Sequence, residues 1–449
     1  MASLPVPYSA LSPSPYIKFS IDDDNLDWGP RVTLLEMIGM VNTGYVMEVT
    51  IQDGEEELLT KFTERDYFNI GRKEPSYAYF RFKSGPGDNW RIPEDSTKIQ
   101  EAIITHFEFF TPPDDRTYIK IIAIDPPSYF LNMGDASGKS YQGRVDQVIT
   151  KVVKQYAPEI EFEMKETTDN ELNRHYMMRQ DAKTFMMSLL EWSTPLNQTS
   201  TNWLIQVDGK KMAISDQGSL TPKNRGYYKR HTSEEFDMII EARTQSNNAL
   251  KLAAVKIYSA GAGSTAGDYL DRITDPDEVK TVARDSTTTE KIIPYVDEFY
   301  SFKKPPDDPS SEPPKIGSTY IPPIPEYYSS GDLGLDYEKY IDGRARNDYL
   351  TLLTSVIKSK IKIPGHGEFI DTFGLGVDTI FINWRKLSSE EAPDQLFWMF
   401  GHWIVYGFRQ RLSYGSWFTE LYITRADEDA KAKKARPLKF NVSDNNLEI

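Results

Sequence analysis

The chain has 449 residues, a formal net charge of −15 at pH 7 and no cysteine. The lack of cysteine excludes disulfides, thiol nucleophiles and thiolate metal sites. The acidic balance argues against a protein that grips nucleic acid through its phosphates, because such binding needs a basic surface.

The hydrophobic content of 39% and the aromatic content of 12% are typical of a folded protein with β-structure, and the length allows two to four domains. No apolar stretch approaches the length that spans a bilayer, so we expect no membrane partner. Residues 1–16 are rich in Pro and Ser and lack the basic and apolar regions of a signal peptide.

Residues 16–125 carry mostly strand signals. Residues 44–51 and 77–83 are β-type residues with a period of two. Residues 103–110 and 117–124 flank a turn rich in Pro and Asp, which predicts a long hairpin. Several strands with turn signals between them indicate a barrel or a sandwich.

Residues 128–228 predict a compact α+β unit. Two apolar stripes at helical spacing predict two helices, the first of them stopped by Pro158. The pair Asp208-Gly209 joins two strand patterns and is a strong signal for a two-residue hairpin. The first stripe consists of Val145, Val148, Ile149, Val152, Val153 and Tyr156, and the second of Ala182, Phe185, Met186, Leu189 and Leu190.

Two further strand patterns, at residues 235–242 and 250–259, precede two weakly structured stretches. The Gly-rich residues 260–267 and the Pro-rich residues 304–325 cannot bury much surface, which indicates loops or a peripheral insertion.

The most regular pattern lies in the hundred residues before the charged tail. A helix-like run at 349–357 leads into Ile361-Lys-Ile-Pro-Gly365 and then into a Gly-punctuated segment at 373–384. An aromatic hairpin follows at 402–425, and residues 427–436 are a predicted solvated helix or tail. We expect a small closed barrel with the aromatic hairpin as its closing edge. We expect a barrel core or a subunit interface, rather than a sugar platform, for Trp398, Trp403, Phe408 and Trp417.

Candidate chemical motifs each fail a geometric requirement. Residues 134–140 place three residues between two glycines where a phosphate loop needs four, so we expect a flexible loop before a helix. Paired acids lie in predicted turns, where water keeps both groups ionised. Asp22 and Asp24 lack the Gly and Glu that complete a calcium loop. The other acid clusters are Glu55–Glu57, Asp114-Asp115 and Glu390-Glu391.

Nucleophilic and metal chemistry have no support either. The chain has no G-x-S-x-G elbow, and its five histidines show no metal-ligand spacing. His402 begins a predicted strand, where a structural role is the commoner one. We therefore predict no catalytic residues, no cofactor-binding residues, no metal-binding residues and no enzymatic activity.

Three segments together resemble the second barrel of phage baseplate hub proteins: residues 361–365, 374–383 and 402–425. These hubs form the T-even-type tail hub family, which is related to the hub part of type VI secretion spike proteins. The final strand carries the pattern T-x-L-x-hydrophobic at Thr419, Leu421 and Ile423. The order of barrel, α+β unit and second barrel with an insertion resembles the family over residues 16–425.

The resemblance implies a mainly β fold with an α+β part, built from two similar small antiparallel β-barrels of the tail-tube kind, an α+β domain and an inserted Pro-rich domain. It places an N-terminal arm at residues 1–15, the first barrel at 16–127, the α+β domain at 128–228, the second barrel at 229–260 with 341–425, the insertion at 261–340 and a charged C-terminal tail at 426–449.

The resemblance also implies a function. Three copies with two barrels each would form a homotrimeric, pseudo-sixfold ring in the baseplate of a contractile tail, which would resolve the symmetry mismatch between the sixfold tail tube and the threefold central spike. The implied partners are the chain itself, the central spike protein, a tail tube or tube-initiator protein, the tape measure protein and other baseplate proteins. DNA would only pass through the lumen, for which an acidic lining would be useful. The implied location is the virion tail baseplate, after assembly in the host cytoplasm.

No fused lysozyme-like domain and no triangular β-helix repeat is visible in the sequence. The aromatic and acidic clusters leave one alternative from another class of protein, a tail-associated glycan-binding or polysaccharide-degrading protein.

Overall fold

The computed structural model describes residues 16–22, 27–54, 56–64, 74–83, 99–113, 116–133, 139–168, 171–177, 180–193, 195–196, 203–220, 223–229, 237–246, 357–367, 369–383, 401–413 and 416–425. A 13-stranded sheet dominates the fold, beside a three-stranded and a two-stranded sheet. The fold is mainly β with an α+β part, so the predicted fold class is confirmed.

The first half of the large sheet has the strand order β1-β4-β5-β6-β3-β2, and all its neighbours are antiparallel. Inward side chains of β2 and β3 are buried at alternate positions, as the period of two predicts. The strands are β1 (Tyr16–Ile21), β2 (Val32–Met40), β3 (Gly44–Gln52), β4 (Tyr77–Lys83), β5 (Gln100–Phe110) and β6 (Tyr118–Ile124). The predicted hairpin is confirmed, because β5 pairs with β6 out to Phe110 opposite Tyr118.

No ladder joins β1 to β2 within the part of the chain that the structure describes. Instead, the segment that contains the 3-10 helix η2 (Gly29–Arg31) lies against β1, where the Trp28 N–H donates to the Phe19 carbonyl at 2.7 Å. The helix α1 (Glu57–Glu64) follows β3, and the buried Asp53 carboxylate accepts from the N–H groups of Leu58 and Leu59 at its start.

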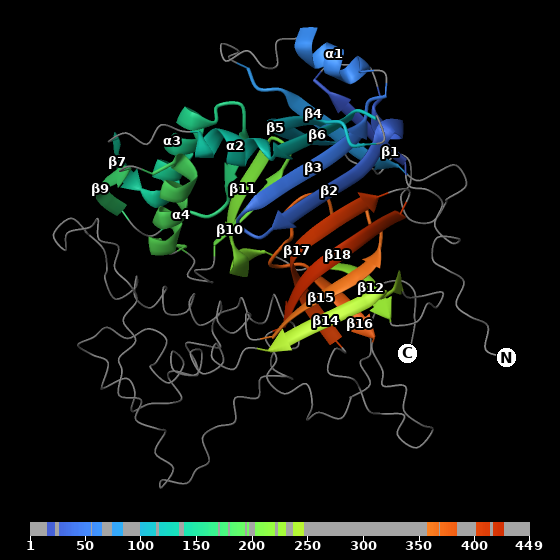
Figure 1. The fold of residues 1–449 in the computed structure, drawn as a ribbon. Coiled ribbons are helices and arrows are strands. Elements are labelled where there is room, and N and C mark those ends of the chain that lie inside the picture. The colour runs from blue at the N-terminus through green and yellow to red at the C-terminus, as the bar shows by residue number, and fades with distance from the viewer. Residues whose placement is uncertain are drawn as a thin grey trace, which may run out of the picture.

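The α+β unit contains both predicted helices and the predicted hairpin. The helix α3 (Val145–Tyr156) buries its apolar stripe against α4 (Ala182–Trp192). The strands β10 (Trp203–Asp208) and β11 (Lys211–Asp216) meet at a two-residue turn, in which Gly209 has φ +55°. The remaining elements are α2 (Pro126–Asn132), β7 (Lys139–Arg144), β8 (Glu161–Met164), β9 (Glu171–Met177) and η3 (Gln217–Ser219). Figure 1 shows the helices α2, α3 and α4 grouped on one side of the large sheet.

The second half of the large sheet closes on itself through one chain segment. This segment is residues 237–246. Its first part, β13, pairs with β12, and its second part, β14, pairs with β15. The ladder β12-β16-β17-β18-β15 completes the circuit. The strands are β12 (Asn224–Lys229), β13 (Asp237–Met238), β14 (Glu241–Ser246), β15 (Ile357–Pro364), β16 (Thr379–Asn383), β17 (Gly401–Ser413) and β18 (Ser416–Arg425).

The two halves are one sheet, because β2 pairs with β17. Gly407 lies opposite Met40 at one end of this ladder and Ser413 lies opposite Leu34 at the other. The strands β2 and β17 run side by side in Figure 1. The expectation that the aromatic hairpin is a closing edge is therefore wrong: β17 has β18 on one side and β16, then β2, on the other.

The strands of the two halves pair in the same way. The strands β2 to β6 have β14 to β18 as their counterparts, in the same chain order. The N-terminal part of β5 pairs with β4 as that of β17 pairs with β16, and both long strands then carry a bulge, between Ile104 and His106 and between Val405 and Gly407. The Ile104 N–H donates to the Ser76 carbonyl at 2.9 Å, and the Val405 N–H to the Asp378 carbonyl at 2.9 Å.

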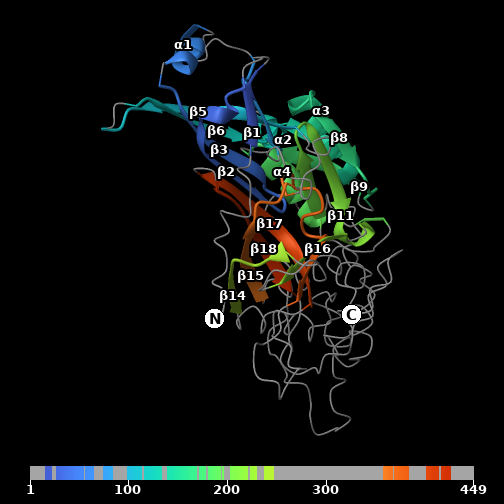
Figure 2. The same cartoon turned by 90° about the vertical axis from the view of Figure 1, so that its right-hand side faces the viewer.

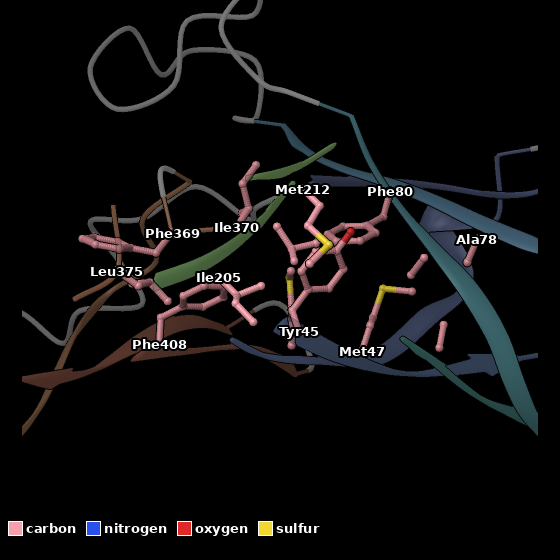
Figure 3. Packing of buried hydrophobic residues seen from close by; sticks show 14 of the residues in the cluster. Tyr45, Met47, Ala78, Phe80, Ile205, Met212, Phe369, Ile370, Leu375 and Phe408 are labelled. Atoms are coloured by element: carbon pink, nitrogen blue, oxygen red, sulfur yellow. The ribbon is translucent and has the colours of Figure 1, made fainter. Parts of the chain in front are cut away.

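One hydrophobic core joins the halves to the α+β unit. Figure 3 shows Ile205 close to Phe408 and Leu375 of the second half, while Met212 lies close to Tyr45 of the first half. Because the β10–β11 hairpin fills the space between the halves, the three parts share a core.

Several predictions concern residues outside the described ranges. These are the strand at 250–259, most of the helix-like run at 349–357, the insertion at 261–340, the arm at 1–15 and the tail at 426–449. The domain boundaries stay a prediction. Among the described residues, no helix is long and apolar enough to cross a membrane.

The β2–β17 ladder predicts a strong effect of one methyl group. A Cβ at Gly39 would lie 2.5 Å from Cε1 of the Phe408 ring, which is buried. We expect Gly39→Ala to lower the free energy of unfolding by about 1–3 kcal/mol through overpacking, measured by denaturant unfolding. The matched control is Gly54→Ala, because a Cβ there meets nothing within 4 Å. Equal stability of the two variants would contradict the prediction.

Candidate functional site

The candidate functional site is the junction at which the two sheet halves meet, together with the contacts that hold the α+β unit against both. On the outer face of the β2–β17 ladder, Arg409 Nη2 donates to Glu36 Oε2 at 2.7 Å, and Arg409 Nη1 lies 3.6 Å from Glu420 Oε2. The hydrogen bond to Glu36 raises the pKa of the Arg409 guanidinium. This partly buried ion pair therefore links the two halves in addition to the backbone ladder.

The turn between β2 and β3 is bound to the α+β unit through Asn42. This residue has φ +61°, a conformation that Asn tolerates better than most residues. Its Nδ2 donates to the Trp203 carbonyl at 3.1 Å, and its Oδ1 accepts from the Ile205 N–H at 2.8 Å. The side chain of Asn42 thus satisfies backbone groups of β10, which is an edge strand of the three-stranded sheet.

The partly buried Lys183 and the buried Asp125 add a second link at the same turn. Lys183 of α4 donates from Nζ to the Thr43 carbonyl at 2.7 Å and to Ser128 Oγ at 2.8 Å. Asp125 accepts from the N–H groups of Tyr45 at 3.0 Å and Ser128 at 2.7 Å. Burial raises the pKa of the Asp125 carboxyl and lowers the pKa of the Lys183 ammonium, while the opposite charge of each partner counteracts both shifts.

The loop before β16 binds the same edge of β10 farther along the strand. The Thr372 N–H donates to the Val207 carbonyl at 3.0 Å, and the Val207 N–H donates to Thr372 Oγ1 at 2.6 Å. Nε2 of the buried Gln217 donates to the Gly376 carbonyl at 2.7 Å. The hairpin is therefore hydrogen-bonded to both halves of the sheet.

A buried ion pair stabilises that loop. Arg225 Nε lies 2.5 Å from Asp378 Oδ2, and the two side chains are 17% and 6% exposed. The guanidinium also donates to the Phe373 carbonyl, and Asp378 Oδ1 accepts from the Lys223 N–H at 3.1 Å. Gly374 has φ +81°, and a Cβ there would lie 2.0 Å from Asp378 Oδ2, so only glycine fits beside the pair. A cavity of about 530 Å³ adjoins the pair.

The outer face of the continuous sheet carries paired charges of both signs. Lys120 Nζ lies 2.9 Å from Glu48 Oε1 in the first half, and Lys360 Nζ lies 2.7 Å from Glu420 Oε2 in the second. This face is therefore not uniformly acidic. Three lysines of β15 also lie over aromatic rings: Lys358 over Tyr406 at 5.4 Å, Lys360 over Tyr422 at 5.7 Å and Lys362 over Phe418 at 4.0 Å.

The structure describes only some residues of the rejected chemical motifs. Lys139 lies in β7 with its Nζ 4.9 Å above the Tyr156 ring, and the helix begins only at Val145. The Asp22 carboxylate accepts from the Tyr77 N–H at 2.7 Å, and Glu57 pairs with Arg31 at 3.0 Å. Residues 114–115, 134–138 and 390–391 lie outside the described ranges, as does the side chain of His402.

Within the described ranges, no group of three or more His, Cys, Asp or Glu side chains could hold a metal ion. The predicted absence of catalytic, cofactor-binding and metal-binding residues stays a prediction.

Sequence reasoning missed the residues that join the parts. Arg225 and Asp378 are 153 positions apart, and Arg409 and Glu36 are 373 apart, so no local pattern connects them. Only for Asn42-Thr43-Gly44 could a local pattern have predicted the structure, because these turn residues lie between two strand patterns.

No protein-family model matches this chain, and no curated protein matches it. Among solved structures, the tail protein from Neisseria meningitidis MC58 superposes with a TM-score of 0.51 at 8% identity, covering 92% of this chain and 97% of that one. The 43 kDa tail protein of prophage MuSo2 from Shewanella oneidensis gives a TM-score of 0.50 at 7% identity, covering 93% and 98%. The E. coli c3393 protein, a component of the type VI secretion system, gives 0.44 at 8% identity, covering 93% and 79%. The first two superpositions show that the chain has the fold of tail proteins over most of its length.

The Arg225–Asp378 pair predicts a large effect on stability. Replacing Arg225 with Leu leaves the buried Asp378 carboxylate without its cation, so we expect a loss of about 3–5 kcal/mol in the free energy of unfolding. The control is Lys211→Leu, since Lys211 is 62% exposed and its pair with Glu161 lies in water. We expect that control to stay within about 0.5 kcal/mol of the unsubstituted protein. Thermal and denaturant unfolding measure both, and a loss that is equally small for both variants would contradict the assignment.

Proposed function

We propose that this protein is the structural baseplate hub of a phage tail. Three copies form a pseudo-sixfold ring that adapts the sixfold tail tube to the threefold central spike and encloses the channel for the tape measure protein and DNA. Its partners are then the spike, a tube or tube-initiator protein, the tape measure and other baseplate proteins, at the virion baseplate of a contractile tail. It has no enzymatic role.

The single observation that carries this proposal is the tail-protein fold over more than nine tenths of the chain. The repeated pairing within the sheet adds support. Each copy contributes two halves with equivalent strands, so three copies offer six equivalent units around one axis. A ring of six such units can face a sixfold partner on one side and a threefold partner on the other.

The alternative of a glycan-binding or polysaccharide-degrading protein rested mainly on the aromatic residues of the hairpin, and their burial argues against it. Trp403 and Phe408 are fully buried, so they cannot stack on a sugar. Tyr406 and Tyr422 are partly buried and lie below lysine side chains. The remaining aromatic residues of the hairpin therefore serve packing better than sugar binding.

We expect the purified full chain to be a trimer by light scattering and a hollow ring in negative-stain images. The reason is that the two halves have equivalent strands, so the kind of strand pairing that joins the halves within one copy can also join neighbouring copies. A monomer that cleaves polysaccharide would overturn the hub and favour the alternative. A compact trimer without a central opening would overturn the channel.

A further inference from the structure

We infer that copies of this chain join by pairing β14 of one with the outer part of β5 of the next, sealed by an ion pair between Arg243 and Glu108. This inference names the contact surface of the proposed ring and rests on that function. It is drawn from the strand registers and the charges of the described residues.

Each of the two strands has a stretch with one unpaired edge in the continuous sheet. Within the described part of the chain, β14 pairs only with β15, and beyond Ile104 the strand β5 pairs only with β6. Figure 2 shows the β5–β6 hairpin extending from one end of the sheet, with β14 at the other end. Open strand edges are templates for pairing with another chain.

The ladder inside the chain gives the register between chains. The strand β17 is the counterpart of β5, and after the bulge its outer part pairs with β2. The strand β14 is the counterpart of β2. The β14 strand of one copy can therefore pair with β5 of the next copy in the same way as β2 pairs with β17 inside the chain. The junction between the halves would then be repeated between copies.

Matching rows of residues across the sheet fix the counterparts. Glu36 lies opposite Glu48, which lies opposite Ile122, which in turn lies opposite His106. In the second half, Arg243 lies opposite Lys360, Lys360 lies opposite Tyr422, and Tyr422 lies opposite Gly407. Arg243 is thus the counterpart of Glu36. Arg409 and Glu108 lie two residues after Gly407 and His106, so they are counterparts as well.

These counterparts place an ion pair of reversed charge at the contact between chains. Inside the chain, Arg409 lies opposite Ile38 and reaches diagonally to Glu36 at 2.7 Å. Between chains, Glu108 would lie opposite Gln245 and reach diagonally to Arg243. Both side chains are exposed in the single copy, Arg243 to 80%. Arg243 Nε donates to Glu241 at 2.7 Å, and the guanidinium has further N–H donors for Glu108.

The same reversal already exists elsewhere in the sheet. Glu48 and Lys120 form an ion pair in the first half, and their counterparts Lys360 and Glu420 form one in the second half with the signs exchanged. The charges also select which halves meet. The strands β2 and β17 already pair with each other inside the chain, so another copy can reach them only if that ladder opens. In that case, pairing β5 with β2 of another copy would bring Glu108 beside Glu36, and pairing β17 with β14 would bring Arg409 beside Arg243. Repulsion between like charges thus favours contact between unlike halves.

Disulfide trapping tests the register, because the chain has no cysteine of its own. In the inferred ladder Phe110 lies opposite Arg243, at a spacing that a disulfide can bridge. We expect the variant with Phe110→Cys and Arg243→Cys to yield covalent dimers and trimers under mild oxidation. The control carries Phe110→Cys and Thr244→Cys, since the neighbouring side chain points to the other face of the sheet. We expect at least tenfold less cross-linked product from the control.

Charge exchange tests the ion pair. We expect Glu108→Arg and Arg243→Glu, each alone, to raise the dissociation constant of the trimer at least tenfold, and the double variant to restore it to within threefold. The control is Glu163→Arg, an exposed residue of β8 far from both edges, which leaves the constant unchanged. Analytical ultracentrifugation at low and high salt measures these constants.

The outcomes separate this inference from the proposed function. A hollow trimer that cross-links equally in the test and control variants would overturn the β14–β5 register and leave the hub standing. A double charge variant no better than the single ones would overturn the ion pair. A chain that stays monomeric under all conditions would overturn both the inference and the ring.

Discussion

The pairing of β2 with β17 is the constraint on which the rest of the structure depends. It joins two halves that are far apart along the chain into one sheet. It also fixes the orientation of the two inner faces relative to each other. The β10–β11 hairpin can fill the space between them only because that geometry is set. Asn42, Lys183 and Thr372 then bind the hairpin and its unit through hydrogen bonds to backbone groups. A change in this ladder therefore affects all three parts.

Close contact at the junction has a physical reason. Gly39 lies opposite Phe408, and the absent side chain leaves room for a buried ring. On the outer face of the same ladder, Arg409 and Glu36 join the strands by charge. Apolar packing on the inner face and an ion pair on the outer face bind the same two strands, so the junction is specific as well as strong.

Much of the fold could be predicted from local patterns. The helices of the α+β unit follow from their apolar stripes, and the Asp208-Gly209 turn follows from the rarity of φ > 0 in other residues. The role of the aromatic hairpin could not be predicted, since an interior strand and an edge strand share the same alternation. Its second neighbour is β2, more than 360 residues earlier in the chain. The buried pair of Arg225 and Asp378 was hidden for the same reason: a sequence separation of 153 leaves no periodic signal.

The reversed ion pairs have a consequence for how this chain can vary. A residue of β2 or β17 acts on the folding of a single copy, whereas in the inferred contact its counterpart in β14 or β5 is covered only when two copies pair. The inferred ladder between copies would then be under selection for assembly, and the β2–β17 ladder under selection for stability. Compensating substitutions for either ladder lie in the same gene, but those at the inferred contact would act between two copies. Two sheet halves with equivalent strand pairing can in this way carry complementary surfaces.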